Sequence, residues 1–162
     1  MTIAPLAPPC GPQNTRAQGQ PEDSRYVESI MEHVFISELL QHRWFIDQDR
    51  VEVIRPEVDA DGFDLVLEAN KHVRHVQLKS RVRHGQARST RINARLREHP
   101  DPCVVWVFWR VDPATCRVSV EYKYSPWQRW PPLEPGEPTF VLKWADFLPD
   151  YVDIEGLVSL LF

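Results

Sequence analysis

The strongest constraint on the fold of this chain comes from two short stretches, residues 62–67 and 74–80. Both are rich in aliphatic and β-branched residues, and the Asn-Lys pair between them is typical of a two-residue turn. Such a turn pairs the two stretches so that Asp64 lies opposite Gln77. The sequence therefore predicts a β-hairpin with a defined register.

Side chains alternate between the two faces of a strand, so this register places Asp64, Gln77 and Lys79 on one face. The opposite face of the hairpin is apolar and comprises Phe63, Leu65, Leu67, Val76 and Leu78. Carboxylate and amide oxygens are hard ligands for Mg²⁺, and a lysine beside them can hold or deprotonate a metal-bound water. The hairpin thus indicates metal-assisted phosphodiester cleavage; the alternative is a polar face that is simply solvated.

The motif formed by Asp64, twelve intervening residues and Gln77-Leu78-Lys79 resembles the signature of the PD-(D/E)xK nuclease superfamily. That superfamily includes many restriction endonucleases and the archaeal-type Holliday junction resolvases. The resemblance covers residues 25–112 and implies a nuclease that uses Mg²⁺ or Mn²⁺, with Asp64 and Gln77 as metal ligands. Position 77 departs from the pattern because glutamate is commonest there. A neutral Gln77 removes one negative charge, so weaker metal binding is expected and catalysis could be lost.

The superfamily also contributes a glutamate from its first helix. Glu32 is the choice here, because Phe35, Ile36 and Leu39 follow it at helical spacing and place it at the edge of a packing face. Glu38 is the rival, since a carboxylate within an apolar stripe demands a metal or another partner. The resemblance thus implies Glu32, Asp64, Gln77 and Lys79 as catalytic residues. Glu32 as a solvated helix-edge acid remains the alternative.

Charge is distributed unevenly along the chain. The net charge is −4, yet residues 71–98 contain nine cations and one acid, a local charge of +8 that leaves −12 elsewhere. A basic segment directly after a candidate metal site is the expected footprint of phosphate contact, although a solvated helix face would look the same. The predicted nucleic-acid-binding residues are Arg81, Arg83, Arg88, Arg91 and Arg95.

The periodicity of the remaining chain predicts an α/β fold with a mixed central sheet flanked by helices. Its order, α-β-β-β-α-β, is that of the restriction-endonuclease-like core. Residues 1–24 read as a disordered tail, and residues 25–162 read as a single domain with a Trp- and Pro-rich C-terminal extension. Helices are expected at 25–42 and 90–98, and strands at 51–55, 63–68, 73–80, 103–111, 117–124 and 140–143.

Composition sets the outer limits of this interpretation. The chain has no apolar run long enough to span a membrane and no basic-then-apolar leader, so a cytoplasmic protein is expected. Its three cysteines are unclustered and give no zinc spacing. The apolar C-terminus, residues 156–162, is expected to pack on the core or to join a homodimer.

Three functions remain compatible with the sequence. The first is a metal-dependent nuclease that acts on DNA. The second is a catalytically weakened nuclease-fold domain that binds nucleic acid or a partner protein. The third is a mixed α/β interaction module whose charges have no role with nucleic acid.

Overall fold

The computed structural model describes residues 21–57 and 61–162, with side chains from residue 24 onward. The chain enters through a long helix, α1 (Pro21–Phe45), at the position predicted for the first helix. The helix begins within the stretch predicted to be a tail, because proline fits the first turn of a helix, where its missing N–H is not needed. The rest of that predicted tail, residues 1–20, lies outside the described residues.

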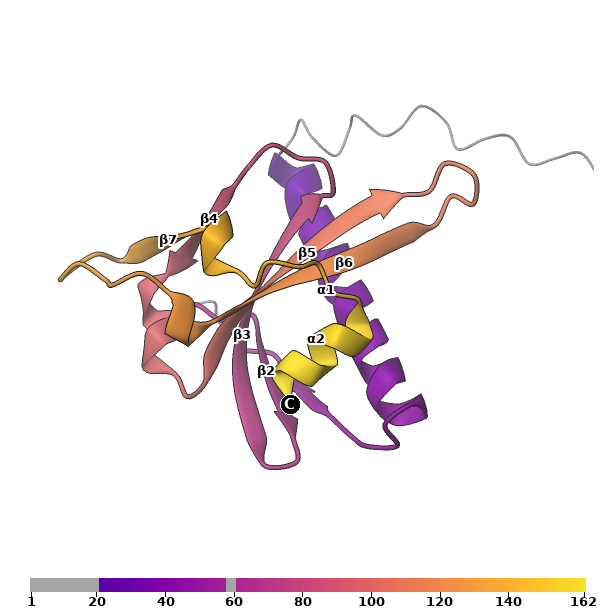
Figure 1. The fold of residues 1–162 in the computed structure, drawn as a ribbon, viewed down its shortest axis with the longest axis horizontal. Coiled ribbons are helices and arrows are strands. Elements are labelled where there is room, and N and C mark those ends of the chain that lie inside the picture. Colours follow the sequence, from indigo (N-terminus) through magenta and orange to yellow (C-terminus); the bar gives the residue numbers. More distant parts are fainter. Residues whose placement is uncertain (1–20, 58–60) are drawn as a thin grey trace, which may run out of the picture.

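A five-stranded sheet forms the centre of the molecule, in the order β1-β2-β3-β5-β6 (Figure 1). Its strands are β1 (Glu52–Ile54), β2 (Leu65–Ala69), β3 (His72–Val82), β5 (Pro102–Val111) and β6 (Val118–Pro126). All neighbours are antiparallel except β3 and β5, which run parallel. The sheet is therefore mixed, as predicted. β5 lies in its interior and is buried over most of its length, while β6 forms an edge.

The predicted hairpin is present. β2 pairs with β3 in the register Leu65↔Val76 and Ala69↔His72, which is the register that the sequence predicts. The two turn residues, Asn70 and Lys71, have φ angles of 50° and 67°. Positive φ at both central positions is the geometry that a two-residue turn requires to match the twist of the strands.

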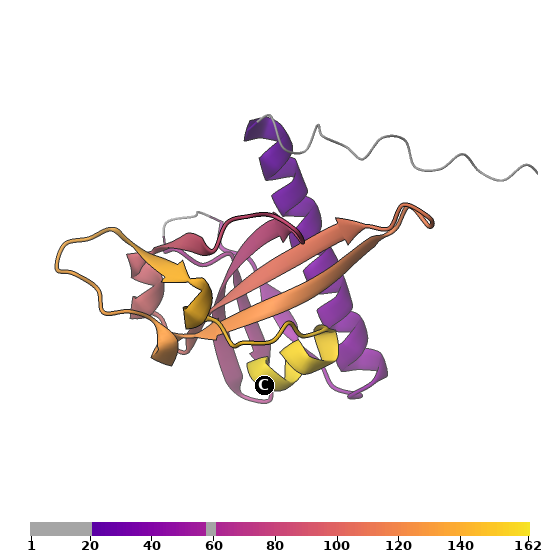
Figure 2. The same ribbon diagram turned by 45° about the horizontal axis from the view of Figure 1, so that its top comes forward.

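One face of the sheet, which we call the helix face, packs against α1 and the C-terminal helix α2 (Ile154–Leu161), which lie side by side (Figure 2). Alternate residues of the strands point into this layer together with one stripe of α1. The buried residues at its centre include Phe35, Leu39, Leu65, Leu67, Val105, Tyr122 and Leu157. The C-terminus thus packs on the core, one of the two expected outcomes.

The opposite face carries a two-stranded antiparallel sheet, β4 (Ser89–Asn93) and β7 (Thr139–Lys143), which we call the ribbon. A second apolar cluster lies between the ribbon and β5, so this side of the central sheet is called the ribbon face. Its buried members are Ile92, Leu96, Val104, Trp106, Phe108, Trp130, Phe140, Leu142 and Phe147. Short 3-10 helices border the cluster at Trp127–Arg129 (η3) and Trp144–Asp146 (η4).

The prediction of a helix over residues 90–98 is wrong. The segment forms strand β4 and then a 3-10 helix, η2 (Ala94–Glu98), capped by the Asn93 side chain. Pairing with β7, about fifty residues further along the chain, supplies backbone hydrogen bonds that a local helix would otherwise make. The fold class nevertheless holds, because β4 and η2 provide the crossover between the parallel strands β3 and β5. Within residues 21–57 and 61–162, no helix is long and apolar enough to cross a membrane.

Candidate active site

Gln77 and Lys79 lie on the ribbon face of β3. Their register partners on β5 are Val104 and Trp106, both members of the ribbon-face cluster. Gln77 is only 7% exposed, and its side-chain carbonyl oxygen Oε1 is buried without a hydrogen-bond partner among the described residues. Such an atom is costly to bury, and a metal ion or a hydrogen-bond donor at this position would satisfy it.

Asp64, just before β2, forms hydrogen bonds with the backbone of β3 on both sides of Gln77. Its backbone N–H donates to the Val76 carbonyl (2.9 Å), and its Oδ2 accepts a hydrogen bond from the Leu78 N–H (2.6 Å). These two contacts bracket Gln77 along the strand. The structure therefore brings Asp64 and Gln77 together, with the aspartate carboxylate standing where a backbone carbonyl would otherwise continue the ladder.

Phe63 does not lie on the helix face, where alternation along the strand placed it. Its ring packs edge-on against His75 (5.0 Å between centroids) and His99 (4.7 Å) on the ribbon face. The reason is that regular pairing of β2 begins only at Leu65, and Gly62 precedes it with φ of +80°. Alternation cannot be extended through that turn.

The His75 and His99 rings stack at 4.8 Å, a pair that the sequence analysis missed. His75 Nδ1 lies 2.8 Å from the Pro100 carbonyl oxygen. Burial, with a smaller contribution from His99, lowers the pKa of His75. A neutral His75 donates from Nδ1 to that carbonyl and supports Phe63, the residue that immediately precedes Asp64. In the sequence, the only sign of this role is that His75 lies two residues before Gln77 and therefore on the same face of the strand.

Lys79 is half-buried and has no ion-pair partner within the described part of the chain. Across the sheet it is aligned with Trp106 and then with Lys123 of β6. Lys123 is fully buried and donates from Nζ to the carbonyls of Leu148 and Pro149, each at 2.7 Å. Burial lowers its pKa. Lys123 therefore fastens the segment before α2, whereas Lys79 remains available to a ligand.

The two candidate glutamates of α1 lie toward different edges of the sheet. Glu32 accepts from Arg55 Nε at 2.7 Å, and Arg55 directly follows β1, whose last residue pairs with Val66, two residues after Asp64. Glu38 instead accepts from the Tyr122 hydroxyl of β6 at 2.8 Å, and burial raises the pKa of Glu38. Glu32 is thus tied to the end of the sheet that carries Asp64.

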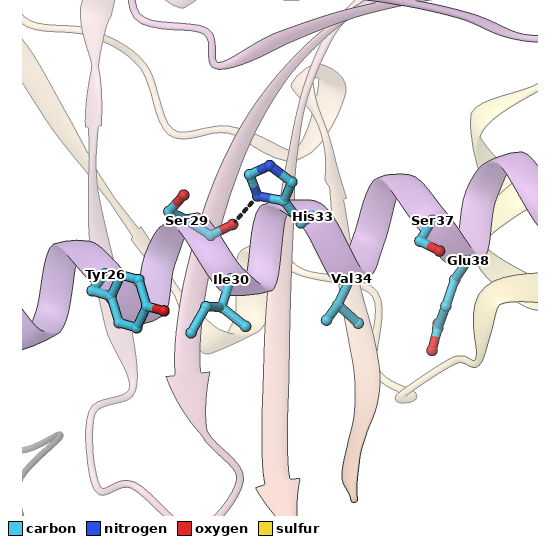
Figure 3. Close-up of a pocket in the computed structure, with 7 residues that line it drawn as sticks. All are labelled: Tyr26, Ser29, Ile30, His33, Val34, Ser37 and Glu38. Atoms are coloured by element: carbon cyan, nitrogen blue, oxygen red, sulfur yellow. Dashed lines mark hydrogen bonds between the residues drawn. The ribbon is translucent and has the colours of Figure 1, made fainter.

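Glu38 also lines a pocket of about 500 Å³ along α1 (Figure 3). Tyr26, Ile30, Val34 and Glu38 project to the same side of the helix in this view. All seven lining residues belong to α1, and the only candidate site residue among them is the rival glutamate, Glu38. The pocket is therefore separate from the Asp64–Gln77 site.

The five predicted arginines fall into two groups. Arg83 pairs with Glu121 and lies 3.5 Å over the Tyr151 ring, and Arg81, like Arg83, is half-buried. The exposed members are Arg88, Arg91 and Arg95, with Arg88 5.0 Å over the Trp144 ring. Only the second group is exposed to solvent.

The donor set for a metal is small. Among the described residues, no three side chains of His, Cys, Asp or Glu gather in a way that could hold a metal ion. Of the nearby acids, Glu57 and Asp61 are exposed, and Asp59 lies outside the described residues. One carboxylate with one amide oxygen suits Mg²⁺, which commonly retains several waters and takes substrate phosphates as ligands. Asp64 and the unpartnered Gln77 Oε1 therefore fit this ion.

This architecture, a mixed sheet with the hairpin motif on one face, is the restriction-endonuclease-like fold. The chain is similar in structure to Hjc, a Holliday junction resolvase from Archaeoglobus fulgidus. The TM-score is 0.51 at 15% sequence identity, over 82% of this chain and 96% of that chain. No family model matches the sequence, and no curated protein matches it. This structural similarity supports the predicted fold. Hjc is a Holliday junction resolvase, one of the groups of proteins named in the sequence analysis.

Proposed function

We propose that this protein is a metal-dependent nuclease that hydrolyses phosphodiester bonds in DNA. The observation that carries the proposal is the buried Gln77 Oε1, which has no hydrogen-bond partner among the described residues. It lies next to Leu78, whose N–H donates to the Asp64 carboxylate. The similarity to a Holliday junction resolvase supports it at the level of fold. Asp64 and Gln77 would hold Mg²⁺ or Mn²⁺ between them.

Each remaining residue has a role that its surroundings permit. A bound Mg²⁺ neutralises charge on the phosphate and acidifies a coordinated water. Lys79, half-buried and without an ion pair in the described chain, would orient that water or the phosphate. Glu32 belongs to α1 on the opposite face of the sheet, and its ion pair with Arg55 ties it to the end of the sheet that carries Asp64, where it would add a carboxylate at the edge of the site. The exposed Arg88, Arg91 and Arg95 would contact the DNA backbone, with Arg81 and Arg83 supporting the loop between β3 and β4.

A second candidate is a nuclease-fold domain with weakened catalysis that binds DNA or a partner protein. The observation that favours it is the neutral Gln77 together with the absence of a three-residue metal cluster among the described residues. A site with one carboxylate binds a divalent ion less strongly than a site with two. The two candidates share the metal ligands and differ only in turnover.

A nicking assay on supercoiled DNA with Mg²⁺ or Mn²⁺ tests the proposal. Asp64→Asn is the variant of choice, because an asparagine Oδ1 can still accept the Leu78 N–H while the negative charge is lost. We expect its activity to fall by about 10²–10³-fold, the typical loss when one preorganised electrostatic group is removed.

The matched control for that assay is Glu155→Gln, which neutralises an exposed carboxylate on α2, and it should cleave like the wild type. Wild-type activity in Asp64→Asn would contradict the proposal. A wild-type protein that binds DNA but never nicks it would favour the second candidate.

A further inference from the structure

The ribbon replaces an expected helix and presents an outer face to solvent. In Figures 1 and 2, β4 and β7 stand to one side of the central sheet. Their register places Ile92 opposite Phe140 and Thr90 opposite Leu142, with Ile92, Phe140 and Leu142 buried. Alternation sends the side chains of Ser89, Arg91, Thr139, Val141 and Lys143 outward, whereas Asn93, at the end of β4, caps η2 with its side chain and lies against Gly62.

The outer face of the ribbon is basic. Two of the outward side chains, Arg91 and Lys143, are cations, and Arg88 and Arg95 lie just before and after β4 in the chain; residues 88–95 and 139–143 contain no acid. Arg91 and Lys143 are exposed, and neither has an ion-pair partner within the described residues. Three acids border these strands: Glu134 and Glu137 precede β7, and the Asp146 carboxylate accepts a hydrogen bond from the Lys143 backbone N–H (2.7 Å). The charge is complementary to a polyanion.

The same face contains no aromatic ring. The rings of this region, among them Trp106, Phe108, Trp130 and Phe140, lie in the buried cluster beneath the ribbon. Proteins that bind single strands stack bases on exposed aromatic side chains, so this surface is poorly suited to unpaired DNA. Hydroxyl, guanidinium, ammonium and methyl groups are instead the kinds that contact base edges and phosphates of a duplex.

The dimensions of the ribbon also match those of a DNA major groove. Its two strands lie about 5 Å apart and five residue pairs extend roughly 17 Å. A two-stranded ribbon of this kind fits the major groove of B-form DNA, which is about 12 Å wide. The major groove of A-form RNA is too deep and narrow for side chains to read.

The ribbon is coupled to the candidate metal site. A Cβ added at Gly62 would lie 2.7 Å from Asn93 Cβ, so β4 ends in direct contact with the turn before Asp64. Only glycine permits this approach together with φ of +80°. A duplex seated on the ribbon is thereby fixed relative to Asp64.

From these observations we infer that the β4–β7 ribbon docks in the major groove of double-stranded DNA, with Arg91 and Lys143 as its principal contacts. The inference rests on the proposed function and specifies its substrate as a duplex, or the duplex arm of a branched structure. Val141, 43% exposed, lies opposite Arg91 and two residues before Lys143, and it meets the base edges. Docking orients the duplex; the ribbon has no part in the chemical step.

Fluorescence anisotropy in EDTA, with no cleavage, tests the inference using the full chain and three probes of one sequence: a DNA duplex, a DNA single strand and an RNA duplex. The wild type should bind the DNA duplex most tightly. Arg91→Gln and Lys143→Gln should each weaken duplex binding and reduce the log–log salt slope by about one. Val141→Asp places a negative charge on the outer face and should abolish binding of the DNA duplex.

Arg25→Gln is the matched control, since Arg25 is exposed on α1 and the change removes the same charge. Equal affinity for the RNA and DNA duplexes, tighter binding of the single strand, or wild-type binding by the Arg91→Gln/Lys143→Gln double variant would overturn the inference. If Asp64→Asn abolishes nicking while that double variant binds normally, groove docking fails and the nuclease stands. If nothing nicks but the ribbon variants lose duplex binding, the nuclease fails and docking stands.

Discussion

The two faces of the central sheet differ in what each buries. The helix face is filled with aliphatic and aromatic side chains, and its polar contacts include the hydrogen bond from the Tyr122 hydroxyl to Glu38. The ribbon face mixes aromatic rings with Gln77, Lys79 and Lys123, and it leaves Gln77 Oε1 without a partner in the described chain. This contrast predicts that substitutions on the two faces will have different effects.

The largest effect is expected on the helix face. Phe35 is fully buried and meets the Tyr122 ring edge-on at 5.8 Å, so Phe35→Ala should lower the free energy of unfolding by about 3–5 kcal/mol. Phe140→Ala on the ribbon face removes the same atoms from a two-stranded sheet that can relax, and it should cost less. Urea unfolding measures both. A larger loss for Phe140→Ala would contradict the assignment of the main core to the helix face.

An effect of opposite sign is expected at Gln77. Gln77→Leu removes a buried carbonyl that lacks a partner in the described chain, so without metal the variant should be more stable by about 1–3 kcal/mol. The matched control is Ser125→Ala, because the buried Ser125 hydroxyl donates to the Asp146 carbonyl (2.7 Å) and accepts from Trp130 Nε1 (3.1 Å). That variant should lose stability. Urea unfolding in EDTA showing both variants destabilised would mean that Gln77 is structural.

The smallest effects concern pH, and the two faces should respond oppositely. The raised pKa of Glu38 means that the folded state holds its proton more tightly, so the contribution of Glu38 falls as pH rises from 4.5 toward the raised value. The lowered pKa of His75 means that the unfolded chain takes up a proton first, so its contribution falls as pH drops below 6.5.

Unfolding free energies of the wild type, Glu38→Gln and His75→Gln across this pH range check both signs. The advantage of the wild type over Glu38→Gln should shrink as pH rises, and its advantage over His75→Gln should shrink as pH falls. Drifts in the same direction would refute the opposition between the faces.

Local pattern explains most of what the sequence predicts correctly. The hairpin register follows from alternation and a two-residue turn, and the position of β5 follows from its continuous apolar run. The interpretation of residues 90–98 as a helix was wrong because β4 depends on β7, a partner distant in sequence. Phe63 was misplaced because Gly62 turns the chain just before regular pairing begins.

The same reasoning holds for the candidate site. The meeting of Asp64 and Gln77 was predictable, since both belong to one hairpin. Two other contacts were not predicted: the stacking of His75 on His99, and the hydrogen bonds from Lys123 to two backbone carbonyls. Each joins segments that are distant in the sequence, so no local pattern indicates it. The roles of Glu32, Asp64, Gln77 and Lys79 in catalysis remain predictions.

The central claim is that Asp64 and Gln77 bind one divalent ion, and calorimetric titration with Mg²⁺ tests it most directly. Gln77→Glu adds a negative charge at the buried oxygen, so it should bind Mg²⁺ more tightly than the wild type, and Asp64→Asn should bind it more weakly. Tighter binding by Gln77→Glu that is lost again in the Asp64→Asn/Gln77→Glu double variant is the predicted result. Unchanged or weaker binding by Gln77→Glu would contradict a shared site.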